Sequence, residues 1–256
     1  MNYGMYLSAA GIVANSYRQD VISNNIANSE TTGFKRDLAT FYARPTEAQA
    51  RGLGGNHTDD VLEQLGGGLF AAPSQFDHSQ GDFESTGNNL DVAIKGDGYF
   101  SVKDTKSNTQ QLTRDGRFAM DTEGNLMLAS ANNQRVLDTA GKPIQVNPSI
   151  PVIIGQDGQI TQAGQPIGQI GVFNVTDASQ LSKAGGQMLN VADPKSLVAA
   201  TNTTLHTQFL ERSNVDPTTE LTQLMDVQRQ LEANANMIRY QDQMLDKLVN
   251  TVGRIG

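Results

Sequence analysis

The stretch TTELTQLMDVQRQLEANANMIRYQDQMLDKLVNTV, residues 218–252, determines one half of the fold. It contains neither proline nor glycine. From position 221 to position 252, residues spaced alternately three and four apart are apolar at eight of ten positions, which is the pattern of a coiled-coil seam. The pattern therefore predicts a helix about 50 Å long, with a seam that includes Leu221, Leu224, Leu231, Ile238 and Leu245.

Two polar residues, Gln228 and Asp242, interrupt this seam. The seam either drifts around the helix, so that Met225, Met244 and Leu248 share the apolar stripe and Asp242 is exposed, or it keeps both polar residues in order to specify register or partner. Just upstream, Asp216 has the chemistry of an N-cap, and Pro217 suits a first helical turn. The helix is therefore expected to begin at this point.

A second helix is predicted at the other end of the sequence, over about residues 4–28. Its apolar residues recur three and four apart and form one stripe, which contains Tyr6, Ala10, Val13 and Tyr17. A polar run then disrupts the pattern, and we expect Asn24, Asn25 and Asn28 to end the helix and fix the exit of the chain. Helices at the two ends of a chain can pair with each other and with neighbouring subunits, and the two apolar stripes are the predicted contact surfaces.

Between the helices the pattern changes to short β segments. Apolar and polar residues alternate in short runs bounded by turn dipeptides such as Asp115-Gly116 and Asp157-Gly158. Strands are expected near residues 90–94, 99–102, 111–113, 117–120, 125–128, 135–137, 151–154, 159–161 and 169–173. Turn signals every 8–12 residues are typical of an all-β sandwich or barrel.

These patterns predict an α+β protein: a mainly-β middle domain, sandwich- or barrel-like, flanked by terminal helices that pair as a coiled-coil assembly core. The expected segments are an N-terminal helix (1–34), a Gly-rich connection (35–68), a β domain (69–207) and a C-terminal helix (208–256). Such a chain can polymerise through its ends while its middle projects outward.

The sequence offers no catalytic, cofactor-binding or metal-binding constellation. It has no cysteine, and its three histidines, His57, His78 and His206, are isolated from one another. Neither zinc-ligand spacing nor a nucleophile elbow is present. Gly96-Asp97-Gly98 lacks the third glycine and the helix of a dinucleotide loop, so a hairpin turn is expected there. The composition thus favours a structural protein over an enzyme.

Charge and hydrophobicity exclude two further classes. The net charge is −8, and there is neither lysine nor arginine between Gly52 and Ile94. A nucleic-acid binder needs clustered basic residues, so no nucleic-acid partner is expected. No apolar run approaches the roughly 18 residues of a membrane span, and residues 1–19 do not resemble a secretory signal. We therefore expect either a cytoplasmic protein or export by a machine that does not read such a signal.

Three segments, in order, resemble the flagellar axial family of rod and hook proteins. The first contains Asn24, Asn25 and Asn28, followed by Gly33-Phe34-Lys35. The second runs from Asn89 to Phe100 and continues at Leu112–Phe118. The third contains Ser213, Asn214 and Val215, followed by Glu220-Leu221. The chain departs from the family pattern at Ser29-Glu30, where Val-Asn is common, at Leu221, where Met is common, and at Leu231, where an aromatic residue often precedes the glutamate. Each departure keeps the chemistry of its position.

The resemblance implies a subunit of the basal-body rod that forms a helical polymer with itself and with other rod and hook subunits. It further implies export through the flagellar type III apparatus without a cleaved signal, a location in the rod that spans the periplasm, transmission of torque for swimming motility, and no direct membrane insertion. Residues 180–186 are slightly more similar to proximal-rod than to distal-rod proteins. The alternatives are another axial-family member, a β-domain adhesin or tail-like module, and a rod-associated wall-cleaving enzyme.

Overall fold

The computed structural model describes residues 2–45, 68–131, 133–177, 180–193, 196–200 and 203–252. Within these ranges the chain forms two compact units. The helical unit consists of the described residues of Met1–Ala27, Arg36–Asp77 and Val215–Gly256, and the β unit consists of those of Asn28–Lys35 and His78–Asn214. The predicted α+β class, with terminal helices flanking a mainly-β middle, is confirmed. Residues 46–67 of the predicted Gly-rich connection lie outside the described residues.

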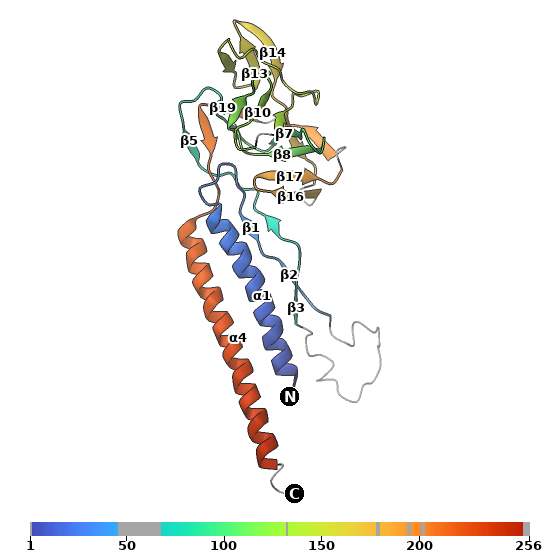
Figure 1. Cartoon of the computed structure of the whole chain (residues 1–256), viewed down its shortest axis with the longest axis vertical. Coiled ribbons are helices and arrows are strands. Elements are labelled where there is room, and N and C mark those ends of the chain that lie inside the picture. Colours follow the sequence, from blue (N-terminus) through green and yellow to red (C-terminus); the bar gives the residue numbers. More distant parts are fainter. Residues whose placement is uncertain are drawn as a thin grey trace. The chain divides into compact units, whose positions relative to one another are not determined.

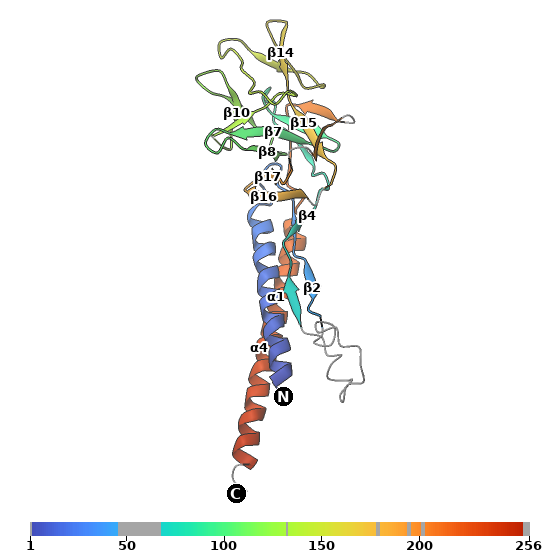
Figure 2. The same ribbon diagram turned by 90° about the vertical axis from the view of Figure 1, so that its right-hand side faces the viewer.

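The helical unit is built on two helices, α1 (Asn2–Ala27) and α4 (Pro217–Val252), which run side by side in opposite directions (Figures 1 and 2). The predicted cap of α4 is present: Asp216 Oδ1 accepts a hydrogen bond from the Thr218 amide at 3.1 Å, and Asp216 Oδ2 accepts one from the Thr219 hydroxyl at 2.5 Å. These bonds hold the pKa of the Asp216 carboxyl below its usual value, because they favour the ionised form.

Two short antiparallel strand pairs complete the helical unit. Strand β1 (Asp37–Leu38) pairs with β4 (Gln75–Phe76), and β2 (Phe41–Ala43) pairs with β3 (Leu69–Ala71). Strands β1 and β3 contact α1. The ring of Tyr17 meets that of Phe41 edge-on at 5.9 Å, and the Tyr17 hydroxyl donates to the Ala72 carbonyl at 3.2 Å. One face of α1 therefore packs against strands rather than against α4.

The β unit contains an open antiparallel sheet in the order β16-β17-β8-β7-β11-β10-β9, with β15 joining β7 to β18. Its strands within the described residues are β7 (Tyr99–Asp104), β8 (Gln110–Thr113), β9 (Phe118–Met120), β10 (Leu126–Leu128), β11 (Gln134–Val136), β15 (Val172–Val175), β16 (Leu181–Gly185), β17 (Met188–Val191) and β18 (Leu197–Ala199).

Smaller antiparallel groups complete the β unit. One is a three-stranded sheet of β12 (Val152–Ile154), β13 (Gln159–Gln162) and β14 (Gln165–Gln169). Two pairs join β6 (Val92–Lys95) to β19 (Thr204–Thr207) and β5 (Phe83–Ser85) to β20 (Phe209–Glu211). The core gathers inward-facing residues of these strands, among them Ile94, Phe100, Leu126, Leu128 and Ile160. Burial alternates along β10, β12 and β13, as the strand pattern in the sequence predicts, whereas β6 and most of β7 are buried on both faces.

Candidate functional site

The two helices meet through layers that recur every seven residues. Gly4 lies opposite Gln241, and Gly11 lies opposite Asn234. A Cβ atom on Gly4 would lie 2.5 Å from Gln241 Nε2, and one on Gly11 would lie 2.8 Å from Asn234 Nδ2. The backbones therefore approach closely where α1 has no side chain, and amide side chains of α4 fill the space.

The predicted apolar stripe of α1 does not form this contact. The side chains of Tyr6 and Val13 are 45% and 67% exposed, and Tyr17 contacts the strands described above. Ala10 lies near Gly68, where a Cβ atom would be 3.2 Å from that of Ala10. The face of α1 that carries the seven-residue repeat also holds buried small, polar and apolar side chains, namely Ser8, Asn15, Ile22 and Asn25. Whether the stripe contacts neighbouring subunits remains a prediction.

The predicted seam of α4 is partly used within the chain. Leu224, Leu231, Ile238 and Leu245 are half-buried, whereas Leu221 is 53% exposed. The other positions facing α1 lie one residue before those predicted, because Val227, Asn234 and Gln241 replace Gln228, Ala235 and Asp242 there. Gln228 and Asp242 are both exposed, and so are Met225, Met244 and Leu248, which the drifting seam was expected to include.

A buried polar node holds the end of α1 against α4. We call it the Glu220 node: Asn25, Arg36, Asp37, Glu220 and Gln223. The side chains of Asn25 and Glu220 are each 1% exposed. Asn25 Nδ2 donates to Glu220 Oε2 at 3.2 Å and to the Asp37 carbonyl at 2.9 Å. The Asp37 amide donates to Asn25 Oδ1 at 2.8 Å. Arg36 Nε pairs with Glu220 Oε1 at 2.5 Å, so the buried carboxylate is neutralised.

Asn25 lies two residues before the end of α1 at Ala27 and binds the backbone of β1 with both ends of its amide. Asn28 caps the turn that follows: its carbonyl accepts from the Thr31 amide at 3.1 Å, and its Oδ1 accepts from the Thr31 hydroxyl at 3.3 Å. Asn24 is exposed.

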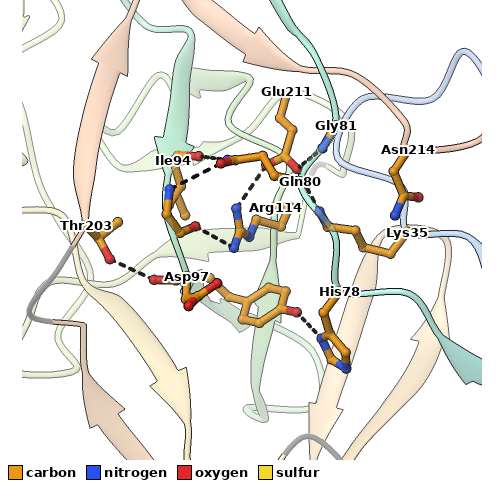
Figure 3. A network of polar contacts seen from close by, with 12 residues as sticks. Lys35, His78, Gln80, Gly81, Ile94, Asp97, Arg114, Thr203, Glu211 and Asn214 are labelled. Atoms are coloured by element: carbon orange, nitrogen blue, oxygen red, sulfur yellow. Dashed lines mark hydrogen bonds and ion pairs between the residues drawn. The ribbon is translucent and has the colours of Figure 1, made fainter.

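Within the β unit, a second buried cluster gathers residues from distant parts of the sequence (Figure 3). We call it the Glu211 cluster: Lys35, Arg114 and Glu211, all at most 4% exposed. Lys35 Nζ pairs with Glu211 Oε1 at 2.7 Å, and an Arg114 Nη pairs with Glu211 Oε2 at 3.1 Å. The Gly81 amide also donates to Glu211 Oε1, at 3.0 Å. One carboxylate thus holds two cations and a backbone amide.

Backbone carbonyls accept further hydrogen bonds from the two cations of the Glu211 cluster, although Arg114 Nε is buried without a partner among the described residues. Lys35 Nζ donates to the Ser79 carbonyl at 2.6 Å, and Arg114 donates to the Gly96 carbonyl at 2.9 Å. The Arg114 guanidinium also lies 5.0 Å from the centroid of the Tyr99 ring. The cluster therefore joins the segments around residues 35, 80, 96, 114 and 211, and a buried ion group of this kind depends on every partner.

The family-signature residues of the β unit surround this cluster. The Gly33 amide donates to the Glu211 carbonyl at 2.8 Å. Phe34 is buried, and Lys183 Nζ lies 4.0 Å from the centroid of its ring. Asn214 Nδ2 donates to the carbonyl and hydroxyl of Ser79 at 3.1 and 3.0 Å. Ser213 is half-buried, and Val215, in the helical unit, is buried.

Lys35, Arg114, Glu211 and Glu220 lie within or beside the three signature segments, but no role was predicted for them. In the sequence, each of these residues is a charged residue beside small or apolar residues. Charged residues exposed to solvent have the same kind of neighbours. Local pattern does not distinguish the two, because Lys35 and Glu211 are 176 positions apart.

Tyr99 links the Glu211 cluster to His78, whose Nδ1 lies 2.8 Å from the Tyr99 hydroxyl. Burial raises the pKa of Tyr99 to about 12 from 10.0, partly opposed by the Arg114 charge and reinforced by Glu211 and Asp97. The unfolded chain loses this proton first, so the contribution of Tyr99 is complete below pH 10 and is lost as the pH rises towards 12.

We accordingly expect the free energy of unfolding to fall by about 2–3 kcal/mol from this group alone between pH 10 and 12. Tyr99→Phe removes the titration. The measurement is urea unfolding of both proteins from pH 9 to 12, in which the stability advantage of the wild type over the variant should shrink. An advantage that is constant across this range would contradict the assignment.

The described residues hold no group of three or more side chains suited to a metal ion. Among the same residues, neither helix is long and apolar enough to cross a membrane. What these residues do show is two buried polar clusters and a closely packed helix pair, which are means of holding backbone segments in place.

Family models match three parts of the chain. The model described as "Flagella basal body rod protein" matches residues 5–35, that of the "Flagellar hook protein FlgE/F/G D1 domain" matches residues 93–162, and that of the "Flagellar basal body rod FlgEFG protein C-terminal" matches residues 206–251. Together these matches include α1, much of the β unit and nearly all of α4.

Curated relatives match over the full length. The chain is 30% identical to the flagellar basal-body rod protein FlgF of Caulobacter vibrioides, covering 100% of both chains. It is 31% identical to FlgF of Mesorhizobium japonicum, over 99% of both. It is also 32% identical to the basal-body rod protein FlgG of Bacillus subtilis, over 96% of this chain and 97% of the relative. Similarity of this extent covers both units.

Proposed function

Because the chain belongs to the family of flagellar basal-body rod proteins and is a structural subunit of the flagellar rod, we propose that it assembles by packing exposed apolar faces of its helical unit against neighbouring subunits. Membership in the family implies assembly with other rod and hook subunits. The helical unit supplies the surface for it, and contacts that repeat head to tail without closing generate a helical filament.

The observation that carries this proposal is the outer face of α4. Leu221, Met225, Met237, Tyr240 and Met244 are 46–68% exposed. Exposed apolar residues that recur along one helix mark an interaction surface, because water contact with each of them is unfavourable. Methionine adapts to irregular partners, which suits a surface that meets more than one kind of subunit.

The predicted assembly residues fit the same proposal. On α1, Tyr6 and Val13 project from the face that α4 leaves uncovered, with Ala10 and Tyr17 beside them. On α4, Leu221 is exposed, whereas Leu224, Leu231, Ile238 and Leu245 are shared with the intrachain contact. We propose that both faces are covered in the rod, where the terminal helices form the coiled-coil assembly core.

Further features of this role are proposed on the family resemblance. The subunit is exported through the flagellar type III apparatus without a cleaved signal, lies in the part of the rod that spans the periplasm, and neither inserts into the membrane nor binds nucleic acid. It transmits torque and has no catalytic activity of its own. We propose a proximal position in the rod, supported by the sequence of residues 180–186.

The paired substitution Met237→Asp and Tyr240→Asp tests the outer face. Both side chains are exposed in the chain itself, so the thermal unfolding midpoint should change by no more than about 1–2 °C. Desolvated contact residues contribute about 2 kcal/mol or more each, so assembly should weaken by more than tenfold and swimming in soft agar should be lost.

The matched control is Gln228→Asp with Gln230→Asp, two residues on the same helix that are also exposed. This variant should swim normally. Normal swimming of the Met237 and Tyr240 variant, with the protein present at wild-type level, would show that the outer face of α4 is not an assembly surface.

A further inference from the structure

The contacts between α1 and α4 repeat in step along both helices. Gly4, Gly11 and Asn25 on α1 lie opposite Gln241, Asn234 and Glu220 on α4. From Gly4 to Gly11 and from Gly11 to Asn25 the spacing on α1 is seven and fourteen residues. The facing residues on α4 are separated by the same spacings in the opposite direction. The layer expected between them holds Arg18 and the buried Val227. The pairing therefore has a single antiparallel register over the length of α1.

The chemistry of these layers is unusual for a helix pair. Apolar layers dominate ordinary coiled coils. In this pair, an amide side chain of α4 fills the space that is free because the facing residue of α1 is a glycine. A Cβ atom at Gly4 or Gly11 would come within 2.8 Å of the facing amide nitrogen, so the amide side chains in their present positions require glycine there. The apolar residues Leu224, Leu231 and Ile238 alternate with these layers and are half-buried.

Apolar residues alone do not define a partner for α4. Because they repeat every seven residues, a slip of one heptad would still place leucine against the face of α1, and a second copy of α4 would also offer them a complementary seam. Either change disrupts the polar layers. A slip of one heptad in either direction would leave only one amide opposite a glycine and would take Glu220 away from Asn25, and in an α4–α4 pair neither amide would face a glycine.

We propose that the two glycine–amide layers, with the Asn25–Glu220 contact, determine the register of the helix pair and select α1, rather than a second α4, as the partner. Gln241 Oε1 is buried and has no hydrogen-bond partner among the described residues. A buried amide oxygen without a hydrogen bond lowers the stability of the folded chain. We therefore infer that this layer contributes to the choice of register and partner helix rather than to stability. The inference concerns the fold of the chain itself and does not depend on its role in the rod.

Introduced disulfides test the register directly, because the chain has no cysteine. Ser8 and Ile238 lie between the two glycine–amide layers, so the pair Ser8→Cys and Ile238→Cys reports the native register and leaves both layers intact. The pair Ser8→Cys and Leu231→Cys reports a slip of one heptad. Such a slip moves a residue about 10 Å along the helix, beyond the reach of a disulfide.

In the otherwise native chain, oxidation of the purified protein should yield the matched intrachain disulfide at least about tenfold faster than the slipped one. In the background Asn234→Leu with Gln241→Leu, the two rates should become similar and disulfide-linked dimers should appear. The control background Gln228→Leu with Gln230→Leu makes the same kind of change at exposed positions of α4 and should keep the native ratio.

An unchanged ratio in the Asn234 and Gln241 background would overturn the proposal, as would equal rates in the native chain. If the double leucine variant precipitates, Asn234→Ala provides a second measurement, since it removes one amide without adding apolar bulk. The ratio should then fall severalfold, and a native ratio would again contradict the proposal.

Discussion

Replacing Glu211 with glutamine is expected to destabilise the β unit by about 3–5 kcal/mol, which is the effect of removing one partner from a buried ion pair. The substitution keeps the size of the side chain but removes its charge. Lys35 and Arg114 would then remain buried without their anion. For a unit of this size, the midpoint of thermal unfolding should fall by roughly 10 °C or more.

The chain offers a matched control in Glu84→Gln. Glu84 pairs with Arg212 at 3.8 Å, but its side chain is 64% exposed. Surface ion pairs contribute about 0–1 kcal/mol to stability, so Glu84→Gln should leave the midpoint of thermal unfolding almost unchanged. Calorimetry or circular dichroism on both variants gives the comparison. Equal shifts in the two midpoints would show that the Glu211 cluster does not hold the unit together.

Replacing Gly33 with alanine is expected to cost more than about 3 kcal/mol. Gly33 has a φ of +70°, in the left-handed region where an added Cβ atom is unfavourable. That Cβ atom would also lie 2.6 Å from the carbonyl carbon of Arg114 and the amide nitrogen of Asp115. Backbone atoms do not move aside as a flexible side chain would, so the segment carrying Lys35 would be displaced.

Gly87→Ala separates the two causes. Gly87 has a φ of +72°, but a Cβ atom there would meet nothing within 4 Å. This variant should lose only the conformational part, about 1–2 kcal/mol. Urea unfolding of both proteins measures the difference. Equal losses would mean that the contact with the segment of Arg114 and Asp115 does not constrain Gly33.

The long helix could be predicted because its signals are local. Residues 217–252 combine an N-cap at Asp216, a proline in the first turn and an uninterrupted three-and-four pattern, and α4 has these bounds. Most strands between residues 90 and 173 were predicted for the same reason, since turn dipeptides mark their ends. Strands β14, β16 and β19 were missed because polar and small residues leave little alternation in them, and β20 was missed because it has only three residues.

The contact face of α1 could not be found by searching for apolar periodicity. Its repeat consists of Gly4, Gly11 and Asn25, which count as turn or surface residues in a local reading. Gly4 and Gly11 are half-buried and Asn25 is buried, because the missing side chains of the glycines let the two backbones approach closely. The apolar residues Tyr6 and Val13, which the periodicity did find, are exposed.

The Glu211 cluster was beyond local reasoning for a different reason. Its three charged residues come from segments separated by 97 and 176 positions, so only the folded β unit brings them together. Such burial shows in the sequence merely as a lysine after Phe34 and a glutamate before Arg212. The roles of the predicted assembly residues stay predictions until an assembled rod is examined.

Electron microscopy of basal bodies from cells lacking this gene tests the central claim most directly. A structural rod subunit is needed before the hook can be added, so the account predicts non-motile cells with truncated basal bodies that lack hooks. A plasmid copy of the gene should restore both the hooks and swimming. Complete basal bodies with hooks on motile cells would contradict the assignment to the rod.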